Sequence, residues 1–175
     1  MISLSQSSIS LYYYYNCPRY LVFSTFKKEL REKYHIPDAS VMRNPVTKAI
    51  LEGGYDWEEK VITKHIHKKV VLGKTSKAKK IRDHVHTSSE TIENLKTLSS
   101  GQYIYQGTLE PSETFLKQFG LDPNVIGFYP SRPDLIQCYE DDFSGLKNLR
   151  VIDLKASDEL KITHKIQVAI YNLLL

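Results

Sequence analysis

The second half of the chain contains several short apolar runs, and residues 103–109 alternate apolar with polar residues at the period of two that is typical of β-strands. These runs predict strands over residues 103–109, 125–129, 132–139 and 149–154. A polar turn containing Gly145 separates the strands 132–139 and 149–154. Between the strands 103–109 and 125–129, residues 111–120 are expected to form a connection with about one helical turn or more. We therefore expect a β-sheet built mainly from residues beyond 100.

Apolar residues at three- and four-residue spacing predict helices in the first half and at the chain end. Residues 5–8 offer N-caps ahead of a helix through Tyr15, and residues 87–90 open another helix that runs to Leu98. Trp57, Val61, Ile62 and His65 predict an amphipathic helix after a turn at Gly53–Gly54. Further helical segments are expected over residues 26–34, 40–41, 47–51 and 164–175, and a short strand over 70–72.

The order of these elements, helices first, then strands, then a helix, predicts an α/β or α+β fold with a mixed central sheet flanked by helices. A length of 175 residues suits one domain, 1–175, with a largely helical basic segment over 27–100 and the sheet and last helix over 101–175. The sequence stops inside an apolar helix without a C-cap signal. We expect a piece of a longer protein, or a minimal domain whose last helix meets a partner.

Composition narrows the function classes only moderately. The hydrophobic content of 41% supports a core, and the net charge of +4 permits an acidic partner. Two cysteines make neither a disulfide framework nor a four-ligand metal site, so a reducing, cytoplasmic setting is expected. The sequence predicts no signal peptide and no membrane contact. For the tyrosines at 12–15, a helix face packed on the sheet is favoured over a base-stacking surface.

A basic segment without acidic residues extends from Lys60 through Arg82. Its usual interpretation is a solvated face, and its functional one is contact with phosphates, above all through Lys77, Lys79 and Lys80. Alternate histidines in the same region, His65 with His67 and His84 with His86, leave a zinc site as a minor alternative. Of the other ligand types, only Asp83 lies nearby.

The most informative stretch is residues 151–155, where an apolar run leads into Asp153 and Lys155. Alternate residues of an extended strand share a face, so the acid and the ammonium project together. Asp134 begins another apolar run, and His164, Gln167 and Tyr171 recur at helical spacing. Two acids and a lysine at a sheet edge can hold a divalent metal and polarise a phosphodiester. These residues favour a metal-dependent nuclease.

Each of these residues also has an ordinary structural explanation. Asp134 could cap a turn, and Asp153 with Lys155 could be an ion pair on an edge strand. Gln167 and Tyr171 could be boundary residues of an amphipathic helix. The nuclease interpretation depends on the whole set occurring in order.

Taken together, the motifs resemble the PD-(D/E)XK nuclease superfamily, and most closely its RecB-type and CRISPR-associated exonucleases. The resemblance extends from about Ser5 to the end and rests on an ordered set: Cys17–Pro18–Arg19, Gly54 shortly before Glu58, Pro133–Asp134, Asp153–Leu154–Lys155 and Gln167–Val168–Ala169–Ile170–Tyr171. It implies a restriction-endonuclease-like core around the mixed sheet, and hydrolysis of DNA.

The resemblance also implies residue roles. Glu58, Asp134, Asp153 and the Leu154 carbonyl would hold Mg²⁺ or Mn²⁺, with Glu59 as the neighbouring alternative to Glu58. Lys155 would orient or help to deprotonate the attacking water, and Gln167 and Tyr171 would touch the DNA backbone or brace the site. His164 can join the face of Gln167 and Tyr171.

One departure from the family pattern concerns cysteine. In many relatives Cys17 is the first of four cysteines that hold an iron–sulfur cluster, but here the only other cysteine is Cys138, outside the pattern. We therefore expect no iron–sulfur cluster in this chain.

The main hypothesis is a Mg²⁺- or Mn²⁺-dependent deoxyribonuclease, expected to be an exonuclease, that acts in recombination, repair or invader defence. Its expected partners are single- or double-stranded DNA, and a helicase, a nuclease complex or a second copy of the chain. Its expected location is the cytoplasm, at the nucleoid. The alternatives are an inactive DNA-binding module of the same fold and a scaffold domain with an incidental acid pair.

Overall fold

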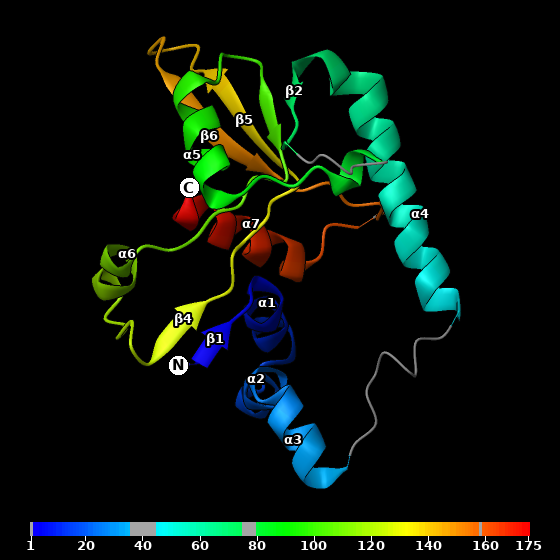
Figure 1. Cartoon of the computed structure of the whole chain (residues 1–175), viewed down its shortest axis with the longest axis vertical. Helices are drawn as coiled ribbons and strands as arrows, with labels where there is room; N and C mark the ends of the chain where they lie inside the picture. Colours follow the sequence, from blue (N-terminus) through cyan, green and yellow to red (C-terminus); the bar gives the residue numbers. More distant parts are fainter. Residues whose placement is uncertain (1, 36–44, 75–79, 158) are drawn as a thin grey trace.

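The computed structural model describes residues 2–35, 45–74, 80–157 and 159–175, which form a mixed α/β structure (Figure 1). Its principal sheet has the strand order β2-β3-β5-β6. β2 pairs parallel with β3, and the pairs β3–β5 and β5–β6 are antiparallel. The sheet is therefore mixed, as the sequence predicts, and its strands are β2 (Val70–Val71), β3 (Tyr103–Tyr105), β5 (Leu135–Glu140) and β6 (Lys147–Ile152).

Alternation along these strands divides the apolar side chains between the two faces of the sheet. Ile104, Ile136 and Cys138 point to one face, where residues of α5 (Ser88–Thr97) and the end of α7 (Ile162–Leu174) cover them. Tyr105 and Leu135 point to the other face and meet Ile62, the first residue of the π-helix η1 (Ile62–Ile66). The sheet thus lies between two helical layers, and the last residues of α4 (Pro45–Val61) lead directly into one of them.

Of the N-terminal helices, α1 (Gln6–Tyr15) packs against α7 (Figure 1). α2 (Pro18–Thr25) packs against α1, and α3 (Lys27–Tyr34) follows α2 and contacts it. A second, two-stranded parallel sheet pairs β1 (Ile2–Leu4) with β4 (Ile126–Phe128). The buried Gln6 amide links these parts, because it donates to the Tyr129 carbonyl and to the Ser131 hydroxyl. The remaining elements are the 3-10 helices His67–Lys69 and Ile81–Asp83 and the helix α6 (Glu113–Gln118).

Local signals in the sequence fix several of these boundaries. The Ser5 hydroxyl accepts from the Ser8 N–H at 3.0 Å and caps α1. Thr87 and Glu90 form a reciprocal capping box that starts α5. Both helix starts are confirmed, as are the charged helix α3 and the strands β3 to β6 within a few residues. The expected segment at 40–41 lies outside the described residues. Within the described ranges, no helix combines the length and the apolar character that a membrane crossing needs.

Two predictions from the sequence are wrong. Gly53 and Gly54 are not a turn but lie inside α4, because nothing within 4 Å crowds them and the helix continues through both. The tyrosine run is not packed on the sheet: Tyr13, Tyr14 and Tyr15 are 62%, 56% and 55% exposed. Their rings instead contact other tyrosines edge-on or at a tilt, which gives partial shelter without a core.

Two glycines should respond in opposite directions to an added methyl group. A Cβ at Gly73 would lie 2.5 Å from the Val85 carbonyl oxygen, so we expect Gly73→Ala to destabilise the fold by about 1–3 kcal/mol. At the exposed helical Gly53 the space is open, so Gly53→Ala should stabilise by about 0.5–1 kcal/mol. Urea unfolding of both variants measures the two effects, and a neutral result at Gly73 would contradict the close approach of these backbones.

Candidate active site

The candidate site forms where β5 begins and β6 ends. Leu135 pairs with Ile152 in the antiparallel ladder, so Asp134 and Asp153, the next residues outward, leave the sheet at the same edge. This pairing brings together two acids that are 19 positions apart in sequence. The residues on either side of Asp153, Ile152 and Leu154, both pack into the cluster around Tyr105. The alternation predicted for residues 152–155 is therefore confirmed.

Lys155 connects the two acids. Its Nζ lies 2.8 Å from Oδ1 of Asp153 and 4.0 Å from Oδ2 of Asp134. The Leu154 N–H also donates to Oδ2 of Asp134, at 2.6 Å. The predicted residues Asp134, Asp153 and Lys155 thus converge, and Leu154 takes part through its backbone N–H. A metal-binding role for the Leu154 carbonyl stays a prediction.

One oxygen of this group has no hydrogen-bond partner among the described residues. It is Oδ2 of Asp153, which is buried and belongs to a side chain that is only 5% exposed. A buried carboxylate oxygen without a partner is costly, and such atoms call for an explanation. A cation would supply the missing interaction.

Glu58 approaches the same group from α4. It is 8% exposed, and its Oε1 accepts from the Tyr105 hydroxyl at 2.8 Å. Burial raises the pKa of Asp134 to about 8, and the negative charges of Asp153 and Glu58 add to this effect. Glu58 therefore lies within electrostatic range of Asp134, while one of its oxygens is occupied by Tyr105. Glu59, the alternative, lines a separate pocket on the surface of α4.

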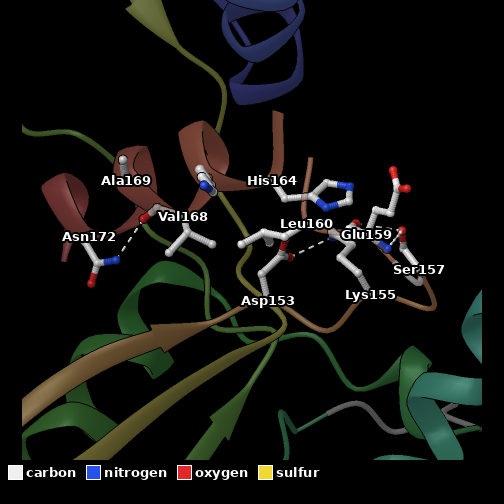
Figure 2. Close-up of a pocket in the computed structure, with 10 residues that line it drawn as sticks. Asp153, Lys155, Ser157, Glu159, Leu160, His164, Val168, Ala169 and Asn172 are labelled. Atoms are coloured by element: carbon white, nitrogen blue, oxygen red, sulfur yellow. Dashed lines mark hydrogen bonds and ion pairs between the residues drawn. The ribbon is translucent and has the colours of Figure 1, made fainter. Parts of the chain in front are cut away.

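A pocket of about 690 Å³ opens beside Asp153 and Lys155 (Figure 2). Its walls are the loop that follows β6 and one side of α7, from which His164, Lys165 and Asn172 contribute. Figure 2 shows His164 and Asp153 facing the same space from these two walls. The predicted residue His164 therefore lies at the site, with the cation of Lys165 next to it in sequence.

The other two predicted residues of α7 lie elsewhere on the helix. Neither Gln167 nor Tyr171 lines the pocket. Tyr171 is buried, and burial together with the charges of Asp153 and Asp134 raises the pKa of its hydroxyl to about 12. Tyr171 therefore lies close enough to the two carboxylates for their charges to act on it, and a bracing role stays a prediction. Gln167 is half-buried. Contact of either residue with DNA stays a prediction.

The residues present fit a hard divalent cation in chemistry, although they do not form a finished metal centre. Within the described ranges, no three His, Cys, Asp or Glu side chains are grouped closely enough to hold a metal. The oxygens of Asp134 and Asp153 are the ligand type that Mg²⁺ and Mn²⁺ prefer. The unpartnered Oδ2 of Asp153 gives the fit its structural basis.

Among the described residues, neither the histidine pairs nor the lysines predicted to touch DNA line the pocket beside Asp153. His86 is buried: its Nε2 donates to the Val71 carbonyl and its Nδ1 accepts from Asn94, so it is neutral and structural. His84 donates to the Gly73 carbonyl at 3.0 Å. Lys80 is exposed, and Lys77 and Lys79 lie outside the described residues.

Sequence reasoning missed two contributors to the site. Tyr105 holds Glu58, and its own pKa is raised by burial and by that hydrogen bond. The alternation of residues 103–105 was visible in the sequence, but the partner across the fold was not. Lys165 follows a residue that was singled out, and helical periodicity places it to one side of His164.

The raised pKa of Asp134 predicts a stability that falls as pH rises. Between pH 6.5 and 8 the unfolded chain has released this proton while the folded protein retains it, so unfolding becomes easier. Of the other described groups with shifted pKa values, only His86 titrates near this window. Its lowered pKa opposes the loss at the lower end, because the unfolded chain still releases the His86 proton there. We expect a net loss of about 1–2 kcal/mol between pH 6.5 and 8 in metal-free buffer. Urea unfolding measures it, and an equal loss in Asp134→Asn would show that another group is responsible.

Comparisons with protein-family models, with curated proteins and with solved structures give no match to this chain.

Proposed function

We propose that the protein is a Mg²⁺- or Mn²⁺-dependent deoxyribonuclease with a restriction-endonuclease-like core, that it works as an exonuclease, and that it acts on DNA in the cytoplasm. The observation that carries the proposal is the convergence of Asp134, Asp153 and Lys155 at one sheet edge, with Oδ2 of Asp153 buried and unpartnered. The antiparallel ladder explains this convergence, because it fixes where both acids leave the sheet.

The reaction requires a water oxygen to bond to phosphorus while the bond from phosphorus to one ester oxygen breaks. A bound Mg²⁺ or Mn²⁺ would activate the water and neutralise charge on the phosphoryl oxygens. Asp153 and Asp134 would hold that cation. To serve as a carboxylate ligand, Asp134 must first release the proton that its raised pKa retains near neutral pH.

Lys155 supplies the positive charge of the site itself. Its ammonium, 2.8 Å from Asp153, can donate to a phosphoryl oxygen or position the attacking water. A proton from the water must finally reach the leaving ester oxygen. His164 lines the same pocket and has a side chain suited to proton transfer. Lys165, also in the pocket wall, can contact a substrate phosphate.

The test is degradation of end-labelled single- and double-stranded DNA by the purified protein with Mg²⁺, with Mn²⁺ and with EDTA. We expect cleavage with either metal and none with EDTA. Lys155→Ala, a residue that is 37% exposed at its side chain, should fold and lose the cleavage. Intact DNA under every metal condition would refute the proposal.

A second candidate is a DNA-binding module of the same fold without turnover. Two observations favour it: Lys155 already contacts both acids, and no three-residue metal group is present among the described residues. Steeply salt-dependent DNA binding without cleavage in either metal would favour this candidate.

A further inference from the structure

A second pocket is lined by residues of α4 and of the π-helix that continues it. α4 lies at the side of the molecule in Figure 1. The pocket has a volume of about 540 Å³, and Trp57, Lys60, Lys64 and His65 contribute to its walls. It shares no residue with the pocket beside Asp153. Neither the carboxylates nor the core explains why an indole lies here, since Trp57 is 39% exposed.

Helical periodicity explains why the indole and the lysines are neighbours. Trp57, Lys60 and Lys64 follow each other at steps of three and four, so they share one side of α4 and its continuation. The following turn is the π-helix Ile62–Ile66, and Ile62, 1% exposed, anchors it in the core beside Tyr105. π-Turns are rare and are frequent at functional sites. The aromatic side chain therefore lies on a rigidly held surface.

Two lysines and one acid give the wall of this pocket a net positive charge. Lys60, Lys64 and His65 are exposed, and no acidic residue occurs in the sequence from position 60 to position 82. Glu59 is the one acid in the pocket wall, and it is half-buried. An aromatic ring flanked by cations matches a nucleic-acid strand, whose base stacks on the ring while its phosphates contact the lysines.

The pocket is also near the proposed catalytic group. Glu58 follows Trp57 directly but faces inward, where it binds Tyr105 and acts on Asp134. Consecutive residues of an α-helix point about 100° apart, so the indole and the inward-facing Glu58 lie on adjacent sides of one helix about 10–12 Å across. A DNA strand bound on α4 can extend around this helix toward Asp134 and Asp153.

We propose that this pocket, formed by Trp57, Lys60, Lys64 and His65, binds an unpaired nucleotide of single-stranded DNA by stacking on Trp57. Duplex DNA is a poorer occupant, because its bases are already stacked on one another and present no free face to an indole. The inference deepens the proposed function, on which its choice of DNA rests, by naming a single-stranded end as the preferred substrate.

Because Trp57 is the only tryptophan in the chain, its fluorescence reports on this pocket alone. The protein to use is Asp153→Asn in EDTA, in which binding is measured without cleavage. Titration with oligothymidylate of about 16 nucleotides should quench the emission to saturation. An equal length of duplex should quench less. Binding that leaves the emission unchanged would place the DNA elsewhere and overturn the proposal.

Variants of Trp57 and of the two lysines measure separately what base stacking and positive charge contribute to DNA affinity. Fluorescence anisotropy of labelled oligothymidylate should show roughly 5- to 150-fold weaker binding for Trp57→Ala and a smaller loss for Trp57→Phe. Lys60→Ala with Lys64→Ala should lower the slope of log affinity against log salt by about 1.4. The matched control is Lys96→Ala with Lys117→Ala, two exposed lysines on α5 and α6.

The outcomes distinguish this inference from the proposed function. If folded Trp57→Ala binds oligothymidylate with wild-type affinity, DNA binding at this pocket is refuted. The same holds if the two double variants have equal slopes of log affinity against log salt. Neither result would bear on the proposed nuclease activity. Quenching by DNA without any cleavage by the wild-type protein would support the pocket and refute the nuclease. Binding of an acidic peptide in preference to DNA would also overturn the inference.

Discussion

Asp153→Asn should reduce DNA cleavage by at least about a hundredfold, because loss of a metal ligand exceeds the 10- to 100-fold cost of losing a supporting residue. The substitution preserves shape and removes the charge of the acid whose Oδ2 is buried without a partner. It also removes the 2.8 Å ion pair with Lys155, so the amine loses its anchor. Initial rates with Mn²⁺ on labelled DNA measure the effect.

The matched control for this variant is Glu93→Gln. Glu93 is an exposed acid on α5 that pairs with Lys96 at 2.7 Å, so the same change of charge occurs away from the site. It should cleave at the wild-type rate. Because a folding defect would also lower the rate, thermal unfolding of both variants must be compared. Substantial cleavage by well-folded Asp153→Asn would remove this acid from the mechanism.

Ile136→Ala should lower the free energy of unfolding by about 2–5 kcal/mol. Ile136, the second residue of β5, is 0% exposed and packs with Leu98, Ile104 and Cys138 in the core beneath α5. Truncation leaves a cavity that the paired strands on both sides cannot close. For a structure that is stable by only some 5–15 kcal/mol, such a loss is large.

Two further variants calibrate this result. Ile136→Val removes one methylene group and should cost about 0.5–1.5 kcal/mol. Ile92→Ala, at a position that is 52% exposed on α5, should change stability by less than about 0.5 kcal/mol. Urea unfolding of all three provides the comparison. Equal effects at positions 136 and 92 would contradict the burial pattern.

Local sequence signals predicted the elements whose causes are local. Ser5 and the pair Thr87 and Glu90 mark helix starts because a side chain there satisfies a free backbone N–H. The short apolar runs in residues 135–139 and 149–152 mark strands, and β5 is buried on both faces between the two helical layers. Asp134, Asp153 and Lys155 could be selected together because each adjoins one of these strands.

Features that depend on distant contacts were not visible in the sequence. Two adjacent glycines normally indicate a turn, yet α4 continues through Gly53 and Gly54 and is then anchored by Ile62 in the core. β3 ends at Tyr105 because Gln106 adopts a left-handed conformation with φ 46°. The bond from Tyr105 to Glu58 spans 47 positions, and no local pattern encodes such a pairing.

The position of Lys155 between Asp134 and Asp153 would make uptake of the proposed divalent cation an exchange rather than a simple addition. The incoming ion would compete with an ammonium that already balances part of the negative charge, and its apparent affinity would be lower. A neutral side chain at position 155 would then retain the ion more tightly while using it less well. Tight binding of the ion and rapid DNA cleavage would therefore place opposing demands on the Lys155 amine.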